Sequence, residues 1–163
     1  MMAPSSPTDP RYLPLKFPKV AFIPRLKTER LVIHALDTAP GWEFDIREVD
    51  RWHREERKWR AIGYHYVISR DGIIVPGRPM DVIGSHTLGW NAVSIAIALA
   101  GGKGAAKNDP FLKHYTPEQD TMLRLMVQAV QRLWPDITVC GHHDHPDVTK
   151  TCPGFNVHEW LNQ

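Results

Sequence analysis

Two short apolar runs constrain the fold more than any other feature of the sequence. Residues 30–35 read Arg-Leu-Val-Ile-His-Ala, and residues 93–99 are filled with Ile and Ala before two glycines at 101 and 102. Runs of β-branched and aliphatic residues without polar alternation are typical of strands that are covered on both faces. The chain is therefore predicted to build a buried central sheet.

A hairpin and a helix are predicted between these two runs. Residues 64–69 and 73–75 flank an Arg-Asp-Gly turn, in which Asp-Gly supplies the positive φ angles that a tight hairpin needs. Residues 45–57 carry apolar side chains on one helical face, and Asp45 with Glu48 has the spacing of a capping box. Both elements fit a sheet that is covered by helices.

The clearest helix lies in the second half of the chain. Thr116 and Gln119 have capping-box spacing around a first-turn proline, and apolar residues then repeat at helical intervals up to Pro135. A short strand at 137–140 and a short helix at 156–161 follow. Strands interspersed with helices predict an α/β fold, with a single mixed central β-sheet flanked by helices.

Length and composition favour one domain with an extended tail. The chain has 163 residues, and six of its fourteen prolines fall within the first 24 positions. Residues 1–28 are therefore predicted to form an extended N-terminal arm that shares little of the core, and residues 29–163 to form the domain. The net charge of +2 lacks the strong basic field of a dedicated nucleic-acid binder. We expect a monomer with no nucleic-acid partner.

Cysteine content and hydropathy set the expected location. Cys140 and Cys152 are too few for a disulfide scaffold, which favours a reducing compartment. The longest apolar stretch, 92–100, is far below the roughly 20 residues that cross a bilayer. Prolines also stand where a signal peptide needs its apolar segment. We expect no membrane insertion, and synthesis in a cytoplasm without a signal peptide.

The residues that could carry chemistry gather in one loop, 141–154. Imidazole and thiolate are ligands that zinc prefers, but the loop lacks the spacing of a structural zinc finger, so a further ligand must come from elsewhere. His34 is the best donor, because an unpartnered imidazole in an apolar strand is costly to bury. Solvated loop histidines are the alternative interpretation. The loop residues concerned are His142, His143, His145, Lys150 and Cys152.

Several motifs follow one another along residues 31–160, about four fifths of the chain. They are Val32-Ile-His34, Gly63-Tyr-His-Tyr66 with Arg70-Asp-Gly72, Gly84-Ser-His86, Ser94-Ile95 with Gly101-Gly102, and Gly141-His142 with Lys150-Thr-Cys-Pro153. Each motif is weak by itself, but their joint occurrence in this order is specific. Together they resemble the zinc-dependent N-acetylmuramoyl-L-alanine amidases, which include the small lysozymes of T-odd coliphages and the peptidoglycan recognition proteins.

The resemblance implies one zinc ion per chain and two further catalytic residues. The zinc ligands would be His34, His142 and Cys152, and the family's essential tyrosine and lysine would be Tyr64 and Lys150. Compared with the phage lysozymes, the loop between the histidine pair and the cysteine is about two residues longer, so His143 is an alternative ligand. We favour His142, because other members place their ligand directly after the loop's glycine with this longer spacing.

Weaker candidates for substrate contacts surround these residues. His65 and His86 could line the cleft, although a hydrogen-bonded structural histidine is the favoured interpretation of each. Trp90 lies in a predicted loop, where a sugar or peptide could stack on it. Strand alternation is expected to place Tyr64 and Tyr66 on the same face of the sheet.

The resemblance implies a peptidoglycan hydrolase. It would cleave the amide between N-acetylmuramic acid and L-alanine with zinc-activated water, as an endolysin that acts on the cell wall after the membrane is breached. A cytoplasmic wall-recycling amidase, a non-catalytic peptidoglycan-binding module and a thiol hydrolase with Cys152 as nucleophile and His142 as base are alternatives. The family's binding modules lack the cysteine ligand, so Cys152 favours catalysis.

Overall fold

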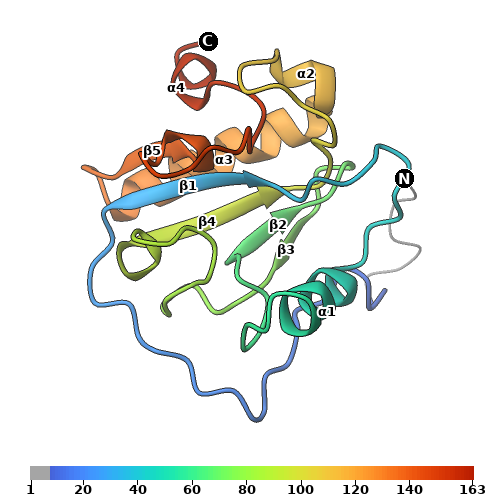
Figure 1. Cartoon of the computed structure of the whole chain (residues 1–163), viewed down its shortest axis with the longest axis vertical. Helices are drawn as coiled ribbons and strands as arrows, with labels where there is room; N and C mark the ends of the chain where they lie inside the picture. Colours follow the sequence, from blue (N-terminus) through green and yellow to red (C-terminus); the bar gives the residue numbers. More distant parts are fainter. Residues whose placement is uncertain (1–7) are drawn as a thin grey trace.

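The computed structural model describes residues 8–163 and contains one five-stranded sheet. Its strand order is β3-β2-β4-β1-β5, and neighbouring strands are parallel except in the β2–β3 hairpin (Figure 1). The strands are β1 (Arg30–Ala35), β2 (Tyr66–Ile68), β3 (Ile74–Pro76), β4 (Ser94–Leu99) and β5 (Thr138–Gly141). The predicted mixed central sheet is confirmed, with both apolar runs as its innermost strands.

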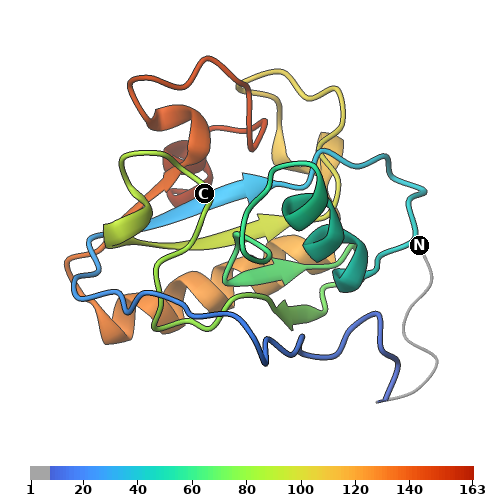
Figure 2. The ribbon, with the colours of Figure 1, turned by 60° about the horizontal axis from the view of Figure 1, so that its bottom comes forward.

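Helices cover both faces of this sheet. Figure 2 shows α1 in front of the strands and the long helix α3 behind them. The α-helices are α1 (Ile46–Glu55), α2 (Phe111–His114), α3 (Pro117–Leu133) and α4 (Val157–Leu161), and two 3-10 turns are η1 (Asn91–Val93) and η2 (His142–Asp144). Within residues 8–163, none of the helices has both the length and the apolar character that a membrane crossing requires.

The sheet face beneath α3 is the main hydrophobic core. Strands β1, β2 and β4 contribute aliphatic side chains to it, and α3 packs a buried stripe against them. This stripe repeats at the helical period predicted from the sequence. The core residues are Leu31, Ile33, Ile68, Ile95, Ile97, Leu99, Leu123, Val127 and Val130.

The opposite face of β4 is built from small residues. Ala96 and Ala98 alternate along the strand with the large aliphatic residues of the α3 face, Ala100 follows directly after the strand, and all three are fully buried. Helix α1 packs over part of this face through Ile46 and Val49. Small side chains on a central strand leave volume above the sheet, and the site described below lies in that volume.

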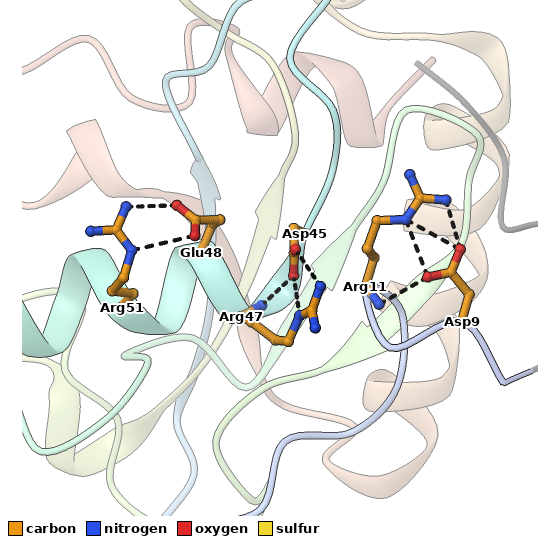
Figure 3. A network of polar contacts seen from close by, with 6 residues as sticks. All are labelled: Asp9, Arg11, Asp45, Arg47, Glu48 and Arg51. Atoms are coloured by element: carbon orange, nitrogen blue, oxygen red, sulfur yellow. Dashed lines mark hydrogen bonds and ion pairs between the residues drawn. The ribbon is translucent and has the colours of Figure 1, made fainter.

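The helix ends follow the predicted signals with one correction. The Thr116–Gln119 capping box of α3 is formed. At α1, the Asp45 side chain accepts a bond of 2.9 Å from the backbone N–H of Arg47, two residues on, and the Glu48 side chain forms an ion pair with Arg51 (Figure 3). The predicted Asp45–Glu48 box is therefore wrong, because Glu48 has a charged partner on the next helical turn.

The predicted hairpin is confirmed, but its turn differs from the expectation. The backbone N–H of Ser69 donates to the carbonyl of Ile73 at 2.9 Å, which leaves a loop of three residues. Among the turn residues only Gly72 has a positive φ, 81°. A three-residue loop of this kind needs one left-handed residue after an ordinary turn, so Asp71 keeps a negative φ.

The segment before β1 is extended, and one of its aromatic residues packs against the core. Residues 8–29 form neither a helix nor a regular strand, and an isolated bridge joins Pro24 to Val82. Tyr12 is 9% exposed and stacks on Phe44 with ring centroids 5.2 Å apart. One aromatic residue of the arm thus joins the apolar cluster beside α1, and the expectation that the arm shares little of the core stays a prediction. Residues 1–7 of the predicted arm lie outside the described residues, and the division at residue 28 stays a prediction.

Candidate functional site

Three side chains that could hold a metal ion meet at the carboxyl-terminal edge of the sheet. His34 lies on β1, while His142 and Cys152 lie on the loop that follows β5, the neighbour of β1. One ligand atom from each residue lies within 4.8 Å of the other two. Because β1 and β5 are parallel, their carboxyl ends share one edge, and the topology brings these distant residues together.

The small residues of β4 make room for His34. His34 pairs in register with Ala98 and is 1% exposed. Burial, followed by the neighbouring charges of His86 and His142, lowers the pKa of the His34 imidazole well below its ordinary value. The ring is therefore neutral at neutral pH, which is the state in which imidazole binds a metal.

Cys152 completes the group with a sulfur ligand. Its Sγ accepts a hydrogen bond of 3.1 Å from the backbone N–H of Ala35 and lies 4.0 Å from His34 Nδ1. Burial raises the pKa of the thiol to about 12, so without a cation it stays protonated. Two imidazoles and a cysteine sulfur held by a backbone donor match the ligand chemistry of zinc, and three protein ligands are typical of catalytic zinc sites.

The structure separates the two neighbouring histidines of the loop. The His142 ring lies 4.6 Å from the His34 ring, between centroids, and belongs to the ligand group. His143 is 5% exposed; its Nδ1 lies 3.0 Å from the Thr151 carbonyl oxygen, and its backbone N–H donates to the Cys152 carbonyl at 2.8 Å. His143 therefore ties the two ends of the loop together and does not join the ligand group.

A cleft of two hollows borders the ligand group. The larger hollow, of about 600 Å³, is lined by His142 and Cys152, the smaller, of about 400 Å³, by His142, and Lys150 lines both. The larger hollow is bordered by α1 and the loop after β1, and it carries the charged residues Asp37, Glu56 and Arg57. A chain-like substrate could thus occupy both hollows, which share His142 and Lys150.

Tyr64 and Lys150 both face this cleft. Tyr64 lines the larger hollow, and its ring centroid lies 5.0 Å from that of His34. Tyr66, in contrast, packs against the core beneath α3. The expectation that the two tyrosines share a face is wrong: β2 begins only at Tyr66, so strand alternation does not extend back to Tyr64.

His53 is a cleft residue that sequence reasoning missed. Its Nδ1 accepts a bond of 2.8 Å from the Gly63 backbone N–H, so the ring proton lies on Nε2, and the residue lines the larger hollow beside Tyr64. Burial lowers its pKa to about 4. The available signal was a histidine four residues after Val49, on the apolar face of the predicted helix.

The three weaker candidates have other surroundings. His65 is fully buried, with Nδ1 accepting from the Ala96 N–H at 3.0 Å and Nε2 2.8 Å from the Val82 carbonyl oxygen. His86 is 7% exposed and lies behind His34. We correct the expectation that these two histidines line the cleft: neither borders either hollow, and the ring nitrogens of both have protein partners, as hydrogen-bonded structural histidines would. Trp90 packs between Arg30 and His145, and its substrate contact stays a prediction.

The chain is similar in sequence to known amidases and endolysins over most of its length. The family model for N-acetylmuramoyl-L-alanine amidase matches residues 24–155. The endolysin of Enterobacteria phage K11 is 33% identical over 143 residues, covering 88% of this chain and 91% of that protein. The endolysin of Escherichia phage T7 is 32% identical over 142 residues, covering 87% of this chain and 91% of that protein.

Solved structures show the same fold. The N-acetylmuramoyl-L-alanine amidase LysC from Clostridium intestinale URNW superposes with a TM-score of 0.75 at 24% identity, covering 92% of this chain and 94% of that one. Bumblebee PGRP-SA superposes with a TM-score of 0.71 at 19% identity, covering 90% of each chain. The sheet and its covering helices are thus common to proteins whose sequences have diverged widely.

Proposed function

The chain belongs to the N-acetylmuramoyl-L-alanine amidase family, and from this premise we propose that it is a phage endolysin. It hydrolyses the amide bond between N-acetylmuramic acid and L-alanine in bacterial peptidoglycan. It works as a monomer, made in the host cytoplasm, which reaches the wall once the membrane is breached. One observation carries the proposal: His34, His142 and Cys152 converge beside a cleft whose larger hollow His142 and Cys152 line.

The ligand group supports a zinc ion as the cofactor. His34, His142 and Cys152 would hold the ion, and the Ala35 N–H would stabilise the thiolate form of Cys152. When bound, zinc supplies Lewis acidity, which makes water a stronger acid and polarises a carbonyl group. The pKa values of His34 and His142 are both lowered, chiefly by desolvation, so both rings are neutral and keep a ring nitrogen that can coordinate.

Lys150 is assigned to the developing negative charge. As water adds to the amide carbon, the carbonyl oxygen becomes an oxyanion that needs an electrostatic partner. Lys150 is exposed and lines both hollows, so its ammonium group can reach an amide that lies across the ligand group. It forms a hydrogen bond or ion pair with the oxyanion without binding the metal.

Tyr64 and His53 supply hydrogen bonds from the other wall. Burial raises the pKa of the Tyr64 phenol, so its O–H stays protonated and can donate to the attacking water or to the substrate. His53 keeps its proton on Nε2 because Gly63 donates to Nδ1, and it therefore offers a second N–H donor to the larger hollow. Through these hydrogen bonds, both groups hold the attacking water or the substrate in position.

A thiol hydrolase is the weaker assignment. A nucleophilic cysteine needs a lowered pKa, whereas burial raises the pKa of Cys152 to about 12. The Sγ atom also lies among the ligand atoms of His34 and His142. Among the described hydrogen bonds, His142 has no carboxylate partner that could orient it as a base. A non-catalytic binding module would have no use for this buried sulfur beside two neutral imidazoles.

Peptidoglycan clearing with and without a chelator tests the proposal. We expect the turbidity of purified cell walls to fall with the enzyme, to stay constant with excess chelator, and to fall again after zinc is restored. Products should carry new L-alanine amino termini and no new reducing sugars. Full activity in chelator with no bound metal would contradict the zinc assignment, and new reducing ends would mean a glycosidase.

A comparison of substrates separates an endolysin from a wall-recycling amidase. An endolysin acts on intact sacculi, whereas a recycling enzyme acts on small soluble muropeptides. We expect efficient cleavage of intact sacculi by this chain. Cleavage confined to soluble fragments would favour the recycling role.

A further inference from the structure

A second histidine stands directly behind the metal ligand His34. The Nε2 atom of His34 lies 2.9 Å from Nδ1 of His86, and the two rings are nearly perpendicular, at 88°. His86 Nε2 lies 3.1 Å from Ser94 Oγ, and the Ser94 hydroxyl donates to the Trp90 carbonyl at 2.7 Å. Four groups therefore form one continuous chain of hydrogen bonds that starts at a backbone carbonyl and ends at His34.

The direction of each hydrogen bond in this series is fixed by the group at its start, the Trp90 carbonyl. A carbonyl oxygen can only accept, so the Ser94 hydroxyl donates its proton to Trp90 and must accept from His86 Nε2–H. His86 then has its proton on Nε2 and a lone pair on Nδ1. That lone pair accepts from His34 Nε2–H, which leaves the lone pair of His34 on Nδ1.

The lone pair of His34 points to the other ligands. Nδ1 is the atom that lies 4.0 Å from Cys152 Sγ. Thr87 Oγ1 lies 3.4 Å from His34 Nε2, where its oxygen can act as a second acceptor for the Nε2–H proton. Thr87 therefore supports the same proton placement.

The residues of this hydrogen-bond series are held in place and shielded from water. His34, His86, Thr87 and Ser94 are each less than 10% exposed. The Asn91 side-chain oxygen accepts from the backbone N–H groups of His86 and Thr87, at 2.9 and 2.8 Å, which fixes the loop that carries both residues. Water cannot replace His86 as the acceptor for His34 at this depth.

We propose that His86 is a positioning residue, which fixes the His34 ring in the tautomer and orientation that turn Nδ1 toward Cys152 and His142. This inference rests on the proposed function, because it treats His34 as a metal ligand. His86 itself does not belong to the ligand group, and it lines neither hollow. Loss of a hydrogen-bond partner behind a ligating histidine typically costs roughly 10- to 100-fold in metal affinity.

A pair of substitutions tests whether the hydrogen bond or the bulk of His86 matters. His86→Asn places an oxygen acceptor near the position of Nδ1, whereas His86→Leu keeps volume but removes the acceptor. We expect the full-length His86→Leu protein to bind zinc roughly 10- to 100-fold more weakly in a chelator competition, and His86→Asn to recover most of that loss. Equal zinc affinity in His86→Leu and the wild type would overturn the inference, as would no recovery in a folded His86→Asn.

His65→Leu is the matched control. His65 is as deeply buried as His86, but its ring bonds only to backbone groups of Ala96 and Val82. We expect His65→Leu to lower the melting temperature without a comparable loss of zinc affinity. If both leucine variants weakened zinc binding in proportion to their loss of stability, His86 would be structural only. Should His86→Leu fail to fold, Ser94→Ala provides the same test, because it removes only the hydroxyl that His86 bonds on the side away from His34. We expect Ser94→Ala to weaken zinc binding several-fold.

A metal-independent measurement separates this inference from the proposed function. Imidazole ¹⁵N chemical shifts of the zinc-free protein report which nitrogen of His34 carries the proton. We expect Nε2–H alone in the wild type and a mixture of tautomers in His86→Leu. If the wild type bound no zinc, the proposed function would fail while the tautomer result still decided the role of His86. A Nδ1–H tautomer in the wild type would overturn the inference.

Discussion

The two faces of the central strand β4 differ in the size of their side chains, and this difference separates stability from chemistry. One face carries Ile95, Ile97 and Leu99, which interlock with α3 in a continuous apolar core. The other carries Ala96 and Ala98, and above them lie buried histidines with fixed hydrogen-bond partners. A single strand thus anchors the fold on one side and provides space for a polar site on the other.

The comparison also explains why so many histidines can be buried in one small domain. An imidazole loses hydration when it is buried, and each one therefore needs a partner. His65 uses backbone groups, His53 uses the Gly63 N–H, and His86 uses Ser94. His34 and His142 are the pair whose remaining nitrogens meet the sulfur of Cys152.

The sharpest test of the site face compares its two cysteines. Cys152 belongs to the ligand group, whereas Cys140 is buried in β5 outside it. We expect Cys152→Ser to lose zinc and lytic activity together, and Cys140→Ser to keep both, as measured by elemental analysis and turbidity clearing. Zinc-free but fully active Cys152→Ser protein would contradict the assignment.

Two cleft substitutions should slow the reaction while leaving the metal site intact. Lys150→Ala and Tyr64→Phe each remove one contact to the reacting groups, and loss of one contact to developing charge costs roughly 10²–10³ in rate. We expect kcat to fall by that order while zinc content and the affinity for wall fragments change little. A variant that turned over at the wild-type rate with zinc bound would show that its residue has no catalytic role.

Neighbouring residues on opposite faces of β4 offer a direct contrast. Leu99→Ala opens a cavity beneath α3, and such changes cost about 2–5 kcal/mol of stability. Ala98→Leu instead crowds the space beside His34, at a cost of about 1–3 kcal/mol. We expect Leu99→Ala to unfold at lower urea with unchanged zinc affinity, and Ala98→Leu to bind zinc more weakly. Equal loss of zinc affinity in both variants would refute the separation of the faces.

The buried histidines should also make stability depend on pH. Burial lowers the pKa of His53 and of His65 to about 4, whereas the unfolded chain protonates them near 6.5. Stability is therefore full above pH 6.5 and falls as pH decreases toward 4, because the unfolded state takes up protons first. In urea titrations with excess chelator, His65→Asn should show a shallower decrease, by up to about 1.4 kcal/mol per pH unit. Parallel curves for the two proteins would contradict this.

The sequence predicted most of the architecture, because its signals were local. Apolar runs, the Asp-Gly turn and the Thr116–Gln119 box mark elements regardless of what they pack against. The four-residue helix α2 (Phe111–His114) escaped notice, since so short an element has no period to detect. The Tyr64 and Tyr66 faces were misjudged because the start of β2 depends on its pairing with β4.

The candidate site was predictable in its residue types but not in its arrangement. The motifs named His34, His142 and Cys152, and the resemblance supplied their shared role. The position of His86 behind His34 depends on a loop held by Asn91, which no periodicity reveals. His53 was missed because a histidine on an apolar helical face is indistinguishable, in sequence, from one that merely fills space.

The sheet order has a consequence for the newly made chain on the ribosome. Strand β1 is synthesised before its two neighbours, β4 and β5, and lies between them in the finished sheet. His34 and Cys152 are 118 positions apart, so a growing chain carries its first ligand long before its last. Contacts between such distant residues form late, because a long loop must close first. A nascent chain that has not yet reached position 152 therefore lacks the third ligand, and the ligand group cannot be completed before that residue has been made.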